Sequence, residues 1–168
     1  RYWEGFDVIL KAWRQEKFSH NGKFYQIENG SLYMKPLQKP MPPTWIAASS
    51  DETLTRAGEL GFSTMGIPFV RSGNILGVKE KNDLFMESYS RAGHKEDPDI
   101  MVALHVCLQR SEEDAVKLAR PHFQRVVDYL KTSTRPGAKI PDLDNVKKEK
   151  LVIFTAPKDA VAILKEYE

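Results

Sequence analysis

The sequence PPTWIAASSDETL, residues 42–54, passes from paired prolines to a short apolar run, then to small hydroxyl residues and a helical pattern. The apolar run from Trp45 to Ala48 predicts a buried strand, and the residues from Asp51 to Leu60 predict a helix. A strand that turns directly into a helix leaves backbone N–H groups without partners at the turn. Those groups and the helix dipole favour an anion there.

The hydroxyl side chains at this turn allow two interpretations. In the first, Ser50 caps the helix and Thr53 occupies its third position, as in many helices. In the second, Ser49, Ser50 and Thr53 donate hydrogen bonds to an anion bound at the helix start. The residue types alone favour the cap.

Strand and helix patterns alternate along the rest of the chain. Strands are predicted at Phe62–Ile67, Ile100–Gln109 and Leu151–Phe154, and helices at Gly73–Arg91, Ser111–Lys131 and Pro157–Tyr167. The first part is different: a helix over Arg1–Glu16, a hairpin-like segment over Phe18–Tyr33 and a proline-rich connector over Pro36–Pro43. Alternation of this kind predicts an α/β fold with parallel strands and crossover helices. The alternation fits either an open doubly wound sheet or part of a (β/α)8 barrel. The chain is too short for a whole barrel, which needs about 250 residues.

Composition limits the class of protein. With 168 residues, 41% of them hydrophobic, the chain can bury a sizeable core, and we expect a single domain over residues 1–168. A net charge of +2 gives no case for a nucleic-acid or membrane partner. The single cysteine, Cys107, fits a reducing compartment, so we expect a cytoplasmic protein. The histidines and the cysteine have no metal-ligand spacing, and we expect no metal.

Several short motifs follow one another in the first part of the chain. Glu4-Gly5-Phe6 and Trp13 precede FSHNGKFY at 18–25 and PLQKPMPP at 36–43. The strand-to-helix turn comes next, and AGELG at 57–61 continues the set. In this order, the motifs resemble the bacterial luciferase-like flavin monooxygenases. The resemblance is weak over 68–150; TAPKDA at 155–160 is similar to a late family segment, with Phe154 where a glycine is usual.

This resemblance implies a fold and a cofactor site. The family fold is a (β/α)8 (TIM-type) barrel, so the chain is expected to be roughly the carboxyl-terminal half of one, an incomplete barrel. A first residue other than methionine, inside a helical pattern, also suggests an excised sequence. The resemblance further implies that Ser50 and Thr53, with Ser49 beside them, hold the flavin phosphate. It assigns no catalytic residue, because the early strands that supply such residues would be absent.

The resemblance also implies a reaction. Reduced FMN and oxygen would oxygenate a small organic substrate, and a separate flavin reductase would be a partner. Two alternatives remain open: a deazaflavin-dependent enzyme that transfers hydride, and a non-catalytic flavin-binding protein. The exposed edges of a half-barrel predict pairing, either in a homo-oligomer or with the missing half.

Three further predictions concern the second half of the chain. On one continuous strand, His105 and Cys107 would share a face with Met101 and Ala103. His105 is then either a hydrogen-bonded structural residue or a flavin-facing acid–base group. The segment 132–150 is polar and predicts a mobile loop, either a solvated charged loop or a lid over the site. A basic partner for the phosphate is also expected, because Asp51 and Glu52 would repel a dianion.

Overall fold

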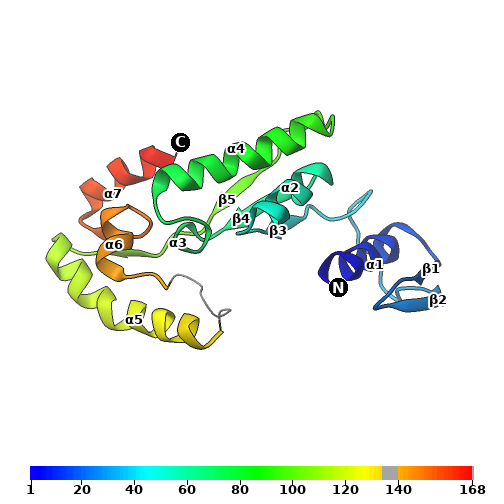
Figure 1. The fold of residues 1–168 in the computed structure, drawn as a ribbon, viewed down its shortest axis with the longest axis horizontal. Helices are drawn as coiled ribbons and strands as arrows, with labels where there is room; N and C mark the ends of the chain where they lie inside the picture. The colour runs from blue at the N-terminus through cyan, green and yellow to red at the C-terminus, as the bar shows by residue number, and fades with distance from the viewer. Residues whose placement is uncertain (134–139, 168) are drawn as a thin grey trace. The chain divides into compact units, whose positions relative to one another are not determined.

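The computed structural model describes residues 1–133 and 140–167, which form two compact units, Arg1–Thr44 and Trp45–Glu168 (Figure 1). Each unit has its own packing and is considered separately below. The sequence-based expectation of one domain over residues 1–168 stays a prediction. None of the described helices is both long and apolar enough to cross a membrane.

The first unit is a helix followed by a hairpin. Helix α1 (Tyr2–Arg14) is amphipathic and buries Leu10 and Ala12. Strands β1 (Phe18–Asn21) and β2 (Gln26–Gly30) pair antiparallel. The predicted helix and hairpin are therefore confirmed.

The second unit contains two parallel sheets. Strands β3 (Trp45–Ala47), β4 (Ser63–Gly66) and β5 (Ile100–Val102) form the first sheet, in that order. Strands β6 (Val106–Leu108) and β7 (Ile153–Thr155) form the second. The predicted α/β alternation with parallel strands is thus confirmed, because the strand pairs among the described residues of this unit are parallel.

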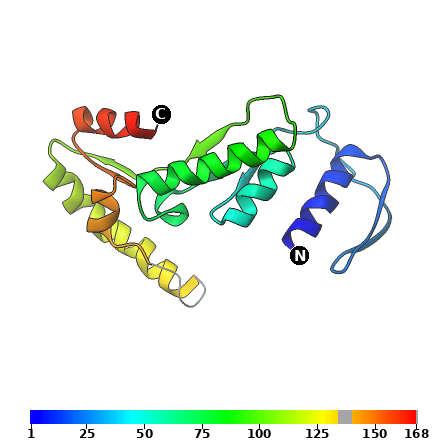
Figure 2. The same cartoon turned by 45° about the horizontal axis from the view of Figure 1, so that its top comes forward.

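Two helices pack closely beside the first sheet. Helix α2 (Asp51–Glu59) and helix α4 (Ile75–Arg91) lie side by side in both ribbon views (Figure 1, Figure 2). Gly58 allows this approach, since a Cβ atom there would lie 2.8 Å from the Phe85 carbonyl oxygen. Leu54 and Phe85 are fully buried. The predicted helices at these positions are confirmed.

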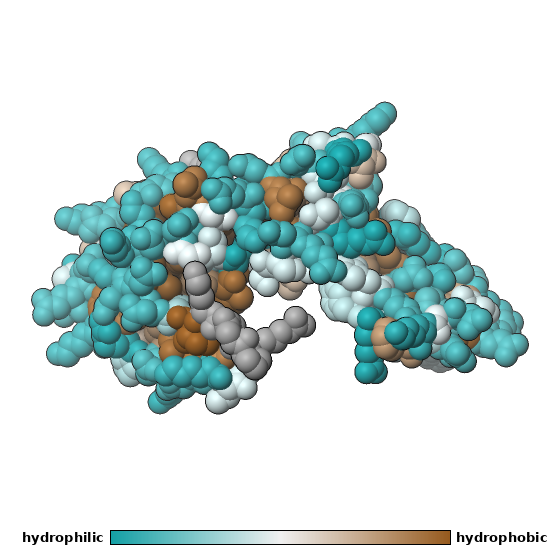
Figure 3. All heavy atoms as spheres, viewed as in Figure 1, coloured by the Kyte–Doolittle hydropathy of each residue, from teal (hydrophilic) through white to brown (hydrophobic). Residues whose placement is uncertain are grey.

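A second hydrophobic core lies around helix α5 (Glu112–Ser133). Its inward side chains pack with strand β7 and helix α6 (Leu143–Lys148), and Phe123 and Leu151 are among the buried members. Helix α7 (Pro157–Leu164) and a 3-10 turn (Lys165–Tyr167) complete the described chain. The space-filling view shows a mostly hydrophilic surface with hydrophobic patches (Figure 3).

Two short helices were not predicted. Helix α3 (Pro68–Arg71) is a single turn that follows strand β4, and helix α6 lies within the segment 132–150 that was expected to be a loop. Residues 134–139 of that segment lie outside the described residues, so its mobility stays a prediction.

The predicted continuous strand over Ile100–Gln109 is wrong. Strand β5 pairs with β4 and strand β6 pairs with β7, and the two are separated at residues 103–105. Exposure alternates along this stretch, but Leu104 and His105 are both half-buried and shift the alternation by one residue. Met101 and Ala103 are therefore exposed, whereas His105 and Cys107 share the more buried side. The shared face expected for these four residues does not exist.

Candidate functional site

The turn between β3 and α2 has the geometry of a capped helix start. Ser50 is the N-cap, with extended backbone angles, and its Oγ accepts a hydrogen bond from the Thr53 backbone N–H at 3.3 Å. The two hydroxyl oxygens of Ser50 and Thr53 lie 2.9 Å apart. The cap interpretation is thus observed directly.

Capping does not use all the donors at this turn. Within the described part of the chain, the backbone N–H groups of Asp51 and Glu52 have no acceptor. One of the Ser50 and Thr53 hydroxyls donates its proton to the other, so the second O–H stays free to donate outward. Ser49 is exposed beside them. These donors surround a position at the positive end of the α2 dipole, which suits an anion.

The acidic residues of the turn are partly neutralised. The Asp51 carboxylate forms an ion pair with the Lys81 ammonium, which comes from helix α4. Glu52 is exposed. The repulsion expected from Asp51 toward a bound dianion is therefore reduced by a cation from a neighbouring helix.

A buried arginine lies next to the same turn. Arg71 ends the single-turn helix α3, and only 5% of its surface is exposed. Its Nε donates to the carbonyl oxygen of Ala48 at 3.1 Å, which places the guanidinium against the end of strand β3. Burial lowers the pKa of Arg71, although an arginine keeps its proton at neutral pH.

Two further hydrogen bonds fix this guanidinium. Arg71 Nη1 donates to Asn82 Oδ1 at 2.8 Å, and Nη2 donates to the Thr64 hydroxyl at 3.3 Å. The Thr64 hydroxyl in turn donates to the Ile46 carbonyl oxygen at 3.3 Å. Sequence reasoning missed Arg71; the only signal was a cation that directly follows the apolar run GIPFV at 66–70.

His105 lies just before strand β6 and packs among aromatic rings. Its ring lies 5.2 Å from Phe69 and 6.3 Å from Phe123, between ring centroids. Burial lowers the pKa of His105, which favours the neutral ring. With Cys107, His122 and Phe154 it lines an apolar pocket of about 400 Å³. Its ring has no hydrogen bond to another described residue, so packing holds it in place.

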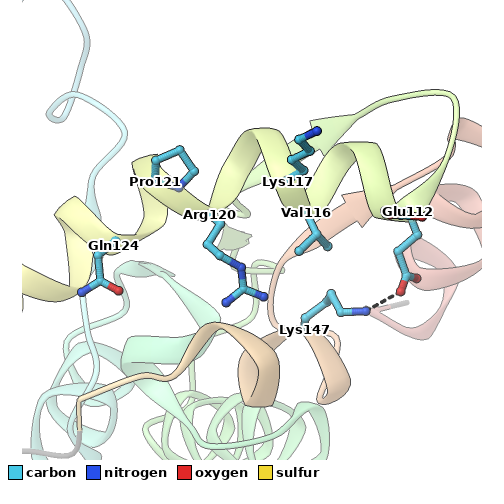
Figure 4. A pocket seen from close by; sticks show the side chains of 8 residues that line it. Glu112, Val116, Lys117, Arg120, Pro121, Gln124 and Lys147 are labelled. Atoms are coloured by element: carbon cyan, nitrogen blue, oxygen red, sulfur yellow. Dashed lines mark hydrogen bonds and ion pairs between the residues drawn. The ribbon is translucent and has the colours of Figure 1, made fainter.

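A wide surface groove lies elsewhere, between helices α5 and α6 (Figure 4). It measures about 870 Å³ and carries Arg120 and Lys147. Arg120 is already paired with Asp144 at 2.7 Å and Lys147 with Glu112, and Lys117 lines the groove as well. The charges of Arg120 and Lys147 are therefore balanced within the protein, and we do not assign a cofactor to this groove.

Comparison with known proteins identifies the family. A family model described as luciferase-like monooxygenase matches residues 1–151. The chain belongs to the luciferase-like monooxygenase family. The resemblance seen in the first 67 residues is thereby confirmed and extends much further along the chain.

Two curated relatives illustrate the sequence match. The oxygenase component of flavin-dependent trigonelline monooxygenase from Acinetobacter baylyi is 32% identical over 116 residues, 67% of this chain and 30% of that protein. The uncharacterized protein y4vJ from Sinorhizobium fredii is 30% identical over 112 residues, 67% of this chain and 31% of that protein. The matched stretch thus spans about a third of these relatives.

Solved structures share the fold. Monooxygenase RslO1 from Streptomyces bottropensis has a TM-score of 0.80 at 19% identity, over 97% of this chain and 48% of that one. A further similar structure is the oxygenating constituent of 3,6-diketocamphane monooxygenase from Pseudomonas putida, which was solved with FMN. Its TM-score is 0.66 at 19% identity, and the match covers 98% of this chain and 52% of that one. The coenzyme F420-dependent tetrahydromethanopterin reductase from Methanopyrus kandleri has a TM-score of 0.71 at 14% identity. That match covers 99% of this chain and 53% of the reductase.

Proposed function

We propose that this chain is part of a flavin-dependent monooxygenase that holds the phosphate of reduced FMN at the turn between β3 and α2. One observation carries the proposal: the free N–H groups of Asp51 and Glu52 and a free hydroxyl of the Ser50–Thr53 pair surround a single helix start. A phosphate dianion accepts several hydrogen bonds and suits such a donor set.

The residues at the turn would bind and orient the cofactor, while the flavin itself supplies the redox chemistry with oxygen. The cation of Lys81 would offset the Asp51 carboxylate as the anion enters. Catalytic residues that touch the substrate are not assigned to this chain. The substrate is proposed to be a small organic molecule, in line with the relative named for trigonelline.

The partners follow from the same relatives. Because that relative is named as an oxygenase component, we propose that a separate flavin reductase supplies the reduced cofactor. The chain matches about half of each similar solved structure, so we propose that it is roughly the carboxyl-terminal half of a (β/α)8 barrel. A homo-oligomer or the other barrel half would then cover its open sheet edges.

A second candidate is hydride transfer with a deazaflavin. It is favoured by the fold shared with the F420-dependent reductase. Spectroscopic titration with FMN and with coenzyme F420 in parallel would distinguish them by affinity.

The phosphate assignment can be tested at Ser50 and Thr53. Replacing both by alanine removes the hydroxyl donors, and we expect FMN affinity to fall about tenfold while riboflavin affinity changes little. Fluorescence titration with both ligands measures this. Riboflavin lacks the phosphate, so it reports any general damage to the site.

Ser111→Ala is a matched control for this double variant. Ser111 also caps a helix, and its Oγ accepts from the Asp114 backbone N–H at 3.1 Å. The Ser111→Ala variant should lose a similar amount of stability and still bind FMN more tightly than riboflavin. An equal loss of FMN and riboflavin affinity in the Ser50→Ala/Thr53→Ala variant would mean that only the cap was lost.

A further inference from the structure

Arg71 carries a buried positive charge that nothing in the described chain neutralises. Its exposed fraction is 5%, and no described carboxylate lies within ion-pair distance of it. All three of its hydrogen-bond acceptors, Ala48, Asn82 and Thr64, are neutral. Neutral acceptors replace lost water contacts, but they leave the net charge in place.

Such an arrangement is costly for a protein to maintain. A buried cation loses its hydration, and proteins normally compensate with an anion nearby. Helix α4 could have supplied one at position 82, which instead holds an asparagine with its Oδ1 2.8 Å from Arg71 Nη1. The missing counter-charge is therefore expected from outside the described chain.

The geometry indicates where that anion would bind. Arg71 Nε holds the carbonyl oxygen of Ala48, and Ser50 follows only two residues later, at most about 7 Å along the chain. The free donors of the β3–α2 turn therefore lie close to the guanidinium along the chain. A charge in the low-dielectric interior acts on an anion at that range more strongly than an exposed cation would.

Strand β4 is shaped to accept this guanidinium. A Cβ atom at Gly66 would lie 2.6 Å from both Nε and Nη2 of Arg71, so the glycine leaves room for the flat group against the strand. The Thr64 hydroxyl then links Arg71 to the Ile46 carbonyl oxygen. The guanidinium is held in one position before any ligand arrives.

We propose that Arg71 is a positioning residue whose buried, unbalanced charge makes the β3–α2 turn selective for a phosphate-bearing flavin over the same flavin without phosphate. This inference rests on the function proposed above. Arg71 acts through the end of strand β3, because its guanidinium binds Ala48 and leaves the turn donors to the ligand. The bound phosphate would be its counter-charge.

Asn82→Asp is the sharpest test, since it places a carboxylate beside Arg71 with almost no change in shape. We expect the melting temperature to rise, because a buried ion pair forms. FMN affinity should fall about tenfold while riboflavin affinity stays within about twofold, because the charge is already balanced. Titration calorimetry with each ligand and thermal melting without ligand measure both effects.

Matched variants separate charge from packing. Ser90→Asp adds the same charge to an exposed position of α4, eight residues or about 12 Å along the helix, and should leave the FMN preference intact. Thr64→Val removes one Arg71 acceptor and keeps the charge, so it should lower stability without changing the preference. Arg71→Met should abolish the preference, and Arg71→Lys should restore part of it.

The outcomes distinguish the two proposals. If the unchanged chain binds FMN no better than riboflavin, the proposed phosphate site is wrong and the role of Arg71 falls with it. If the unchanged chain prefers FMN but Asn82→Asp keeps the full preference, the phosphate site stands and the Arg71 inference is overturned.

Discussion

At the residue scale, Glu4 shows how one carboxylate ties a hairpin to a helix. Its Oε1 accepts from the backbone N–H groups of Phe24 at 2.9 Å and Tyr25 at 2.8 Å, and lies 3.4 Å from His20 Nε2. Loss of water contact alone would raise the pKa of Glu4. The hydrogen bonds from Phe24, Tyr25 and His20 outweigh it, so the pKa lies below its usual 4.5.

This shift predicts a pH dependence for the first unit. Because the folded pKa of Glu4 is lowered, its contribution to stability is present above pH 4.5 and is lost as the pH falls through the folded value. We expect hydrogen exchange at the Phe24 and Tyr25 amides to speed up, relative to the intrinsic rate, as the pH falls in that window. NMR exchange measurements would follow it residue by residue.

Glu4→Gln should reduce this pH dependence, because the amide oxygen still accepts but does not titrate there. Asp7→Asn is the control, since Asp7 also lies 3.4 Å from His20 but receives no backbone hydrogen bond from the hairpin among the described residues. An unchanged acid response in Glu4→Gln would show that another group controls it.

At the element scale, the contact between α2 and α4 depends on the missing side chain of Gly58. A Cβ atom there would lie 2.8 Å from the Phe85 carbonyl oxygen and 2.9 Å from the Tyr89 backbone nitrogen. Both are backbone atoms of α4, so they cannot rotate away. The turn that begins α2 is therefore held by close packing at the other end of the same helix.

Gly58→Ala should destabilise the second unit. Alanine is worth about 1 kcal/mol more than glycine inside a helix, but overpacking against backbone costs about 1–3 kcal/mol, so a net loss of unfolding free energy is expected. Urea unfolding followed by tryptophan fluorescence would measure it. Gly73→Ala is the control, because a Cβ atom there meets nothing within 4 Å. A more stable Gly58→Ala protein would contradict the close contact.

Local patterns predicted the elements around the turn well, and tertiary effects explain what they missed. Strand β3 and helix α2 follow from an apolar run and a cap spacing that lie within a dozen residues. The break at residues 103–105 left no such signal, because the residues on both sides continue a strand-like pattern. Arg71 could not be placed from sequence, since its partners Ala48 and Asn82 are 23 and 11 residues away.

At the scale of the whole molecule, the family and the α/β fold were accessible from motif order, whereas the site needed coordinates. The hydroxyl residues Ser49, Ser50 and Thr53 were named from sequence, and their role as phosphate ligands stays a proposal. The structure added cations to that site, Lys81 on α4 and Arg71 on α3. They come from separate helices that the fold places around one strand end.

The most direct test of the central claim is an amide NMR titration of the chain with FMN and, separately, with riboflavin. If the phosphate binds at the β3–α2 turn, FMN will shift the backbone amides of Asp51, Glu52 and Thr53 strongly, and riboflavin will not. Equal shifts with both ligands, or FMN shifts confined to the Arg120–Lys147 groove, would contradict it.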